Sequence, residues 1–152
     1  MKIPTIMERG RFLEFEIVTR HPEWNYVVLR VKDADVAIRF YHEFAGMGAV
    51  MDIREQDGKR WVRMHQPEHP EGPVLVLEET PDAGDLRAVV GFRTASRAEV
   101  DRLATKAARA DCLTTQAYDG GSFRGYVCTI VDPDGNHLEF FCPIADKPTQ
   151  SA

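Results

Sequence analysis

The chain has 152 residues, of which 43% are hydrophobic and 28% are charged, a balance typical of one globular domain with a buried core. Its formal net charge of −5 argues against a nucleic-acid binder or a protein of anionic membrane surfaces, because both need a basic face. No apolar run approaches the ~18 residues of a membrane span, and the first residues lack the apolar segment of a signal peptide. We therefore expect a cytoplasmic protein.

The cysteines suggest neither disulfides nor a thiolate metal site. Cys112, Cys128 and Cys142 are odd in number and have no C-x-x-C spacing. We expect them to be buried, reduced thiols.

Residues 1–24 form either an arm that packs on a partner subunit or an ordered lead-in strand of the same chain. Phe12, Phe15, Ile17 and Val18 suggest a short strand, and His21-Pro22 then marks a break.

From Asn25 onward the sequence predicts a strand, then a helix, then three strands. Tyr26 to Val31 is β-branched and apolar, as in a buried strand. Asp33 is a good N-cap for an amphipathic helix that ends near Gly46 or Gly48. Three further strands are predicted at about 49–54, 59–65 and 73–79. The proline-rich loop between the last two contains Glu68-His69-Pro70-Glu71, which we expect to be exposed.

The same order then repeats, which indicates an internal duplication. A strand at 89–94 is followed by Ser96 as N-cap and by a helix with Val100, Leu103 and Ala107 on its apolar side. Strands near 113–118, 126–131 and 137–142 complete the second unit. The segment Asp119-Gly120-Gly121 is predicted to be a flexible loop.

The stretch Val131 to Pro143 gives the clearest local signal. Asp132-Pro133-Asp134-Gly135 has the chemistry of a type I turn, so a strand must follow. Alternation places His137, Glu139 and Phe141 on one face. The opposite face is wholly apolar and is predicted to lie under a helix. An ionisable pair beside a large aromatic side chain is typical of a pocket wall.

The Gly135-Asn136-x-Leu138-Glu139 run after this turn resembles the vicinal oxygen chelate superfamily of glyoxalases, bleomycin resistance proteins and extradiol dioxygenases. The resemblance covers roughly residues 25–143 and leaves 144–152 as a C-terminal tail. It implies an α+β fold of two tandem βαβββ modules, about 25–80 and 88–143, forming a curled mixed sheet around a cavity. It also implies a homodimer, because a second copy commonly covers the exposed edges and apolar faces of such modules.

The resemblance implies that four positions converge on a metal, at the first and last strands of each module. Carried onto this sequence they are Tyr26, Glu78, Val89 and Glu139, with Glu78 as the internal counterpart of Glu139. Valine has no donor atom, and phenol ionises only near pH ~10. The two carboxylates suit Mg²⁺ or Mn²⁺, whereas Zn²⁺ or Fe(II) requires imidazole.

Two histidines are the available substitutes for the missing imidazoles. His137 shares a face with Glu139, and His65 shares a face with Trp61 and Arg63. Histidines in such places are more often structural than ligating. We therefore favour a site without a metal cofactor. The alternative is a divalent metal held by a set of side chains that comprises Glu78, Glu139, His137 and His65.

A metal-free cavity would bind a small organic molecule through Tyr26, Trp61, Arg63 and Phe141. Arg63 would pair with a ligand carboxylate or phosphate, or else neutralise one of the acids. Two adjacent carboxylates, Glu78 and Glu139, would raise the pKa of one of them and make it a general acid or base, for which Glu139 is the first choice.

The leading hypothesis is thus a small-molecule binding protein or a carboxylate acid/base enzyme without a transition metal. The alternative is a metal-dependent lyase, isomerase or dioxygenase. A third hypothesis is an interaction module that docks through its N-terminal arm.

Overall fold

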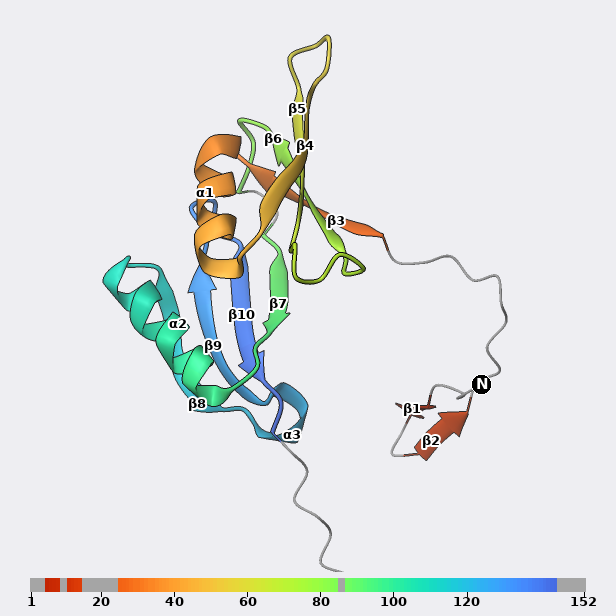
Figure 1. The fold of residues 1–152 in the computed structure, drawn as a ribbon, viewed down its shortest axis with the longest axis vertical. Helices are drawn as coiled ribbons and strands as arrows, with labels where there is room; N and C mark the ends of the chain where they lie inside the picture. Colours follow the sequence, from red (N-terminus) through yellow and green to blue (C-terminus); the bar gives the residue numbers. More distant parts are fainter. Residues whose placement is uncertain (1–4, 9–10, 15–24, 85–86, 145–152) are drawn as a thin grey trace, which may run out of the picture.

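The computed structural model describes residues 5–8, 11–14, 25–84 and 87–144 (Figure 1). The first module contains β3 (Tyr26–Val31), α1 (Ala34–Ala45), β4 (Gly48–Arg54), β5 (Arg60–His65) and β6 (Val74–Glu79). The second contains β7 (Val89–Arg93), α2 (Arg97–Arg109), β8 (Leu113–Asp119), α3 (Gly121–Arg124), β9 (Tyr126–Val131) and β10 (His137–Cys142). Among the described residues, every helix is too short or too polar to cross a membrane.

The predicted N-terminal strand differs from what is described. β1 (Thr5–Glu8) and β2 (Arg11–Glu14) pair with each other in an antiparallel hairpin, with Thr5 opposite Glu14. Phe12 belongs to β2, whereas Phe15, Ile17 and Val18 lie outside the described residues.

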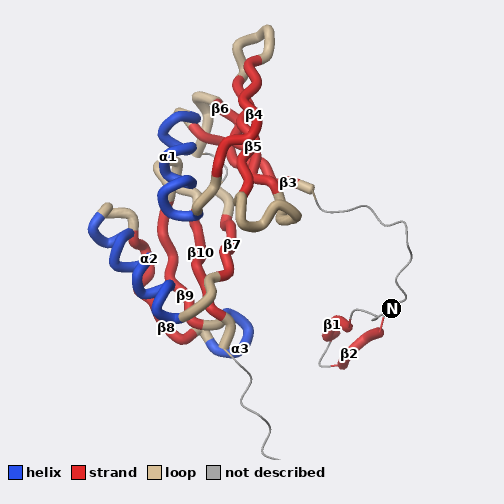
Figure 2. The backbone as a smooth tube through the Cα atoms, in the orientation of Figure 1, coloured by secondary structure: helices blue, strands red, loops and turns tan. Residues whose placement is uncertain are grey.

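The two modules have the same topology, which confirms the predicted α+β fold and its tandem βαβββ units. Each forms one four-stranded mixed sheet, in the order β3-β6-β5-β4 and β7-β10-β9-β8. The first and last strands of each module run parallel, and the remaining pairs are antiparallel. One helix covers one face of each sheet (Figure 2). We call the opposite face of each sheet its outer face.

The predicted capping residues begin both long helices. The Asp33 side chain accepts a hydrogen bond from the amide of Val36, and Ser96 accepts one from Glu99. Helix α1 ends at Gly46, whose φ of +63° is left-handed and therefore suits glycine. Helix α3 was not predicted, because a single turn leaves no apolar periodicity in the sequence.

The second module contacts the first through the turn before β10. Asp132 is buried, and it accepts hydrogen bonds from the amides of Asp134 and Asn136 and from the Asn136 side chain, which fixes the predicted turn. It also accepts one at 2.8 Å from the hydroxyl of Tyr41, a fully buried residue of α1. Burial and the nearby Asp132 raise the pKa of Tyr41, so its hydroxyl stays a donor.

The apolar cores of the two modules are continuous. Buried side chains of α1 and its sheet join those of α2, β9 and β10 in a single cluster. Within the second module, the Asn136 side-chain oxygen accepts the amide of Ala88 and so joins the turn before β10 to the start of β7. The helix-covered faces are therefore occupied by the core, and the outer faces are left for function.

Replacing Tyr41 by Phe should lower the free energy of unfolding by about 1.5–3 kcal/mol, because a buried carboxylate loses a donor. Urea unfolding measures this change. The control is Tyr26→Phe, since Tyr26 is 56% exposed and should show almost no change. Equal stability of Tyr41→Phe and the wild-type chain would contradict this account of the module contact.

Candidate functional site

The last strand presents the two faces that its sequence predicts. Leu138 and Phe140 are buried in the core, whereas His137, Glu139 and Phe141 are partly exposed on the outer face of the second sheet. In register, Glu139 lies between Gly91 of β7 and Thr129 of β9. On the β7 side of Glu139, Gly91 supplies no side chain, and the Phe141 ring lies close to its backbone.

Glu139 forms an ion pair that the sequence analysis missed. Its carboxylate accepts a hydrogen bond at 2.6 Å from Arg124, whose other terminal nitrogen donates to the Tyr118 hydroxyl at 3.1 Å. The side chains of Arg124 and Glu139 are 49% and 27% exposed, so a ligand can reach both. We call Tyr118, Arg124 and Glu139 the Arg124 cluster. A basic side chain just after a glycine-rich turn and before a strand was the available sequence signal.

The short helix α3 holds Arg124 in place. Backbone hydrogen bonds of 2.8 Å join Gly120 to Gly125 and Gly125 to Gly121, and the Asp119 carboxylate accepts the amide of Gly121. Gly125 has a φ of +73°, and a side chain there would clash with the backbone of Cys142. The predicted flexible loop at Asp119-Gly120-Gly121 is therefore a bonded turn.

Glu78 lies on the other sheet and is neutralised there. Its carboxylate contacts the Lys59 ammonium at 2.5 Å and the Arg30 guanidinium at 3.4 Å, with its own side chain only 10% exposed. The bond to Lys59 is the main cause that holds the pKa of Glu78 below its ordinary value. From the sequence we expected Glu78 and Glu139 to be adjacent and so to raise the pKa of one of them. The pKa of Glu78 is instead lowered.

The neighbouring residues of β5 form a partly covered wall on the outer face of the first sheet. Lys59 lies 4.7 Å from the centre of the Trp61 ring, within range of a cation–π contact. Arg63 donates to the Asn25 side chain at 3.4 Å and contacts neither predicted acid among its described hydrogen bonds. Trp61 Nε1 and His65 Nδ1 are buried without a protein partner within the described part of the chain. Both nitrogens thus lack the protein partner that buried polar groups usually have.

The sequence matches the model of the Glyoxalase/Bleomycin resistance protein/Dioxygenase superfamily over residues 24–140. The chain belongs to this family. It is 35% identical over 123 residues to the uncharacterized protein PA2024 of Pseudomonas aeruginosa, covering 78% of this chain and 87% of that protein.

Solved structures of the family share the fold. A glyoxylase/bleomycin resistance protein/dioxygenase domain from Frankia sp. has a TM-score of 0.67 at 22% identity, covering 82% of this chain and all of that one. TnmS3, an antibiotic binding protein from a Streptomyces species, has a TM-score of 0.61 at 23% identity, with 84% and 100% covered.

The strand register corrects one equivalence drawn from the family pattern. Val28 lies opposite Val76 in the first sheet, and Gly91 lies opposite Glu139 in the second. Tyr26 and Val89 precede their helix caps by the same number of residues, so Val76 is the counterpart of Glu139. The expected pairing of Glu78 with Glu139 is wrong by two positions.

The donors do not fit the family's metal site. The four equivalent positions are Tyr26, Val76, Val89 and Glu139, and only one of them is a carboxylate. Among the described residues, no group of three or more His, Cys, Asp and Glu side chains is placed to hold a metal ion. The four alternative ligands are divided between the sheets. His137 and Glu139 lie on the second sheet, and His65 and Glu78 lie on the first.

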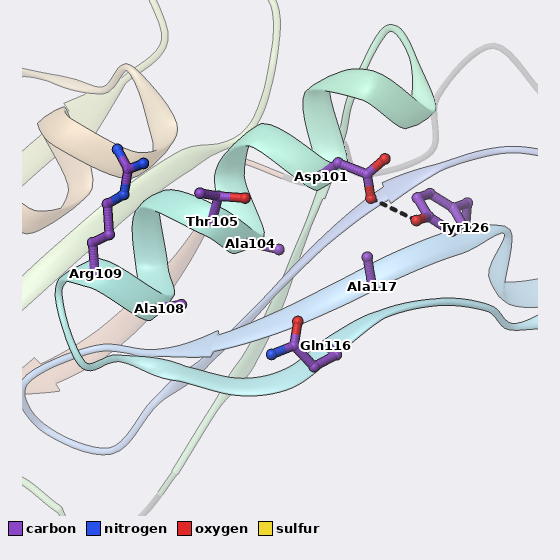
Figure 3. Close-up of a pocket in the computed structure, with 8 residues that line it drawn as sticks. All are labelled: Asp101, Ala104, Thr105, Ala108, Arg109, Gln116, Ala117 and Tyr126. Carbon is purple, nitrogen blue, oxygen red and sulfur yellow. Dashed lines mark hydrogen bonds between the residues drawn. The ribbon is translucent and has the colours of Figure 1, made fainter.

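Two of the cavities have neither Glu78 nor Glu139 in their walls, although Gly91, the strand partner of Glu139, lines the larger one. One of about 830 Å³ is bounded by the loop that includes His69 and by β7, with Val27, Val90 and Phe92 in its wall. The predicted exposed loop therefore borders a hollow. Another, of about 630 Å³, is an open hollow between α2 and β8, with the hydrogen-bonded Asp101 and Tyr126 at one end (Figure 3).

Replacing Glu78 by Gln should lower the free energy of unfolding at pH 7 by about 1 kcal/mol, because an ion pair with two bases is lost. A lowered pKa means that the carboxylate stabilises the fold above its unfolded pKa and loses this effect as the pH falls through the folded pKa. The difference between variant and wild type should therefore shrink below about pH 4.3. Urea unfolding at several pH values measures it.

The control variant is Glu55→Gln, because Glu55 is exposed in the β4–β5 turn. It should match the wild type at every pH. A Glu78→Gln deficit that does not change with pH would show that the ion pair is not its cause.

Proposed function

We propose that the chain binds a small organic molecule on the outer faces of its sheets without a transition metal. The observation that carries the proposal is which side chains occupy the family's four metal positions. Three of these positions hold Tyr26, Val76 and Val89, none of which is a carboxylate or an imidazole. The fourth, Glu139, is in an ion pair with Arg124. An ion paired in this way has its charge compensated by the protein itself.

The side chains around these positions suit a flat, partly apolar ligand. Tyr26 is 56% exposed, and Trp61 and Phe141 are partly exposed on the same outer faces. Aromatic walls bind planar rings with about 0.5–1.5 kcal/mol beyond the burial of area. The antibiotic-binding relative supports a sequestering role, and Glu139 supports the other form of the proposal, in which it accepts or donates a proton.

We further propose that a second copy of the chain covers the outer faces and so forms a cavity there. Each sheet ends in strands paired on one side only, namely β3, β4, β7 and β8. Large apolar side chains are exposed on the first sheet's outer face, including Val28, Met51 and Ile53. Exposed edges and apolar faces of this kind are commonly covered by another chain.

The metal-free proposal predicts that Zn²⁺, Ni²⁺ or Fe²⁺ added to EDTA-treated protein gives no tight, stoichiometric binding in calorimetry. The reason is the shortage of nitrogen and oxygen donors around Glu139. Tight binding that disappears in both Glu139→Gln and His137→Ala would overturn the proposal and favour the metal-dependent lyase, isomerase or dioxygenase.

The dimer proposal predicts that the chain sediments as a dimer and that Ile53→Asp weakens association at least about tenfold, because a carboxylate would be buried without a partner. Sedimentation velocity over a concentration series measures this. Thr105→Asp is the matched control, since Thr105 is exposed on α2, away from the outer faces. A wild-type monomer at all concentrations would contradict the proposal.

A further inference from the structure

The outer faces are more basic than the chain as a whole. The chain carries a formal charge of −5. Among the described strand residues of the two outer faces, the carboxylates are Glu78 and Glu139. The basic side chains on or over these faces are Arg30, Lys59, Arg63, Arg93 and Arg124. Such a separation of charge favours an anionic partner at these faces.

On the first sheet the basic side chains are already committed to Glu78 and Asn25. Arg124 on the second sheet is different. A guanidinium has five N–H donors, of which Glu139 and Tyr118 take two in the described structure. The side chain is 49% exposed, so its remaining donors can reach a ligand. Arg124 is therefore placed to bind a ligand carboxylate in the bidentate mode.

Aromatic side chains lie on the elements that carry the Arg124 cluster. Tyr118 is bonded to it and is 38% exposed, and Phe123, its neighbour in α3, is 100% exposed. Phe141 lies on the Glu139 face of β10, with its ring 3.6 Å from where a side chain of Gly91 would begin. Because Gly91 has none, the Phe141 ring lies over the backbone of β7 and leaves a flat surface beside Glu139.

We propose that the Arg124 cluster binds the carboxylate of a planar aromatic acid, and that this carboxylate replaces Glu139 as the partner of Arg124. The inference rests on the proposed function and names its ligand class. A ligand carboxylate that pairs end-on with both terminal nitrogens of Arg124 needs the position that Glu139 occupies on Nη2, so the two anions compete. Binding therefore leaves the Glu139 carboxylate unpaired beside the ligand, where it can accept a proton.

The competition makes an unusual prediction, namely that removing an acid from the site improves binding. The probe is 2-naphthoate, compared with neutral 2-naphthylmethanol and cationic 2-naphthylmethylamine, in calorimetry at low ionic strength where charges are least screened. Glu139→Gln should bind 2-naphthoate about two- to fivefold tighter, as expected for removing a competing exposed ion pair. Arg124→Met should bind it about tenfold more weakly, with 2-naphthylmethanol unaffected.

The controls separate this inference from the proposed function. Arg102→Met removes an equal charge from the exposed side of α2 and should leave 2-naphthoate binding unchanged. Arg124→Lys keeps the charge but loses the planar pair of donors, so its affinity for 2-naphthoate should lie between those of the wild type and Arg124→Met. This variant replaces Arg124→Met in the test if Arg124→Met misfolds.

Equal affinity of the wild-type chain for all three probes, or weaker binding of 2-naphthoate by Glu139→Gln, would overturn the inference while the proposed function stands. Failure of all three probes to bind would count against both. Binding of 2-naphthoate that is lost in Arg124→Met and strengthened in Glu139→Gln would support the exchange of partners.

Discussion

The buried Asp132 carboxylate is the contact on which the rest of the molecule depends. It closes the turn that starts β10, and it receives the Tyr41 hydroxyl from the helix of the other module. Such a group is costly to bury unless its lone pairs are used, and four donors satisfy it here. A single residue thereby sets the position of β10 and the packing of the two modules, so that it indirectly places Glu139.

The polar and aromatic character of the outer faces follows from where each module buries its apolar side chains. The helices take one face of each sheet into a common core, so residues on the other face are free to be polar or aromatic. Each acid there is paired with a base, because a carboxylate on a half-buried strand is more stable with a cation beside it. The two pairs differ in access. Glu78 is covered by Lys59 and Arg30, whereas Glu139 and Arg124 remain open to solvent.

The duplication explains why one sheet and not the other carries the candidate chemistry. The backbone register is the same in both modules, yet the equivalent positions hold Val76 in one and Glu139 in the other. A family whose members include enzymes and binding proteins uses one fold for several tasks, so the function depends on these few side chains. Our proposal of an organic anion as the ligand therefore rests on Tyr26, Val76 and Val89 at three of these positions and on Arg124 beside Glu139 at the fourth.

The sequence by itself determined the elements, their order and the alternation of β10, because hydrophobic period, helix caps and the Asp132-Pro133-Asp134-Gly135 turn are local signals. It also indicated Glu139 and Phe141 as outer-face residues. It did not determine the register of β6 against β3, so Glu78 was matched to Glu139 in place of Val76, since a shift of two residues keeps every side chain on the same face. Only the tertiary structure brought Arg124 and Tyr118 to Glu139, because the ion pair joins a single-turn helix to a strand across the sheet and has no period in the sequence.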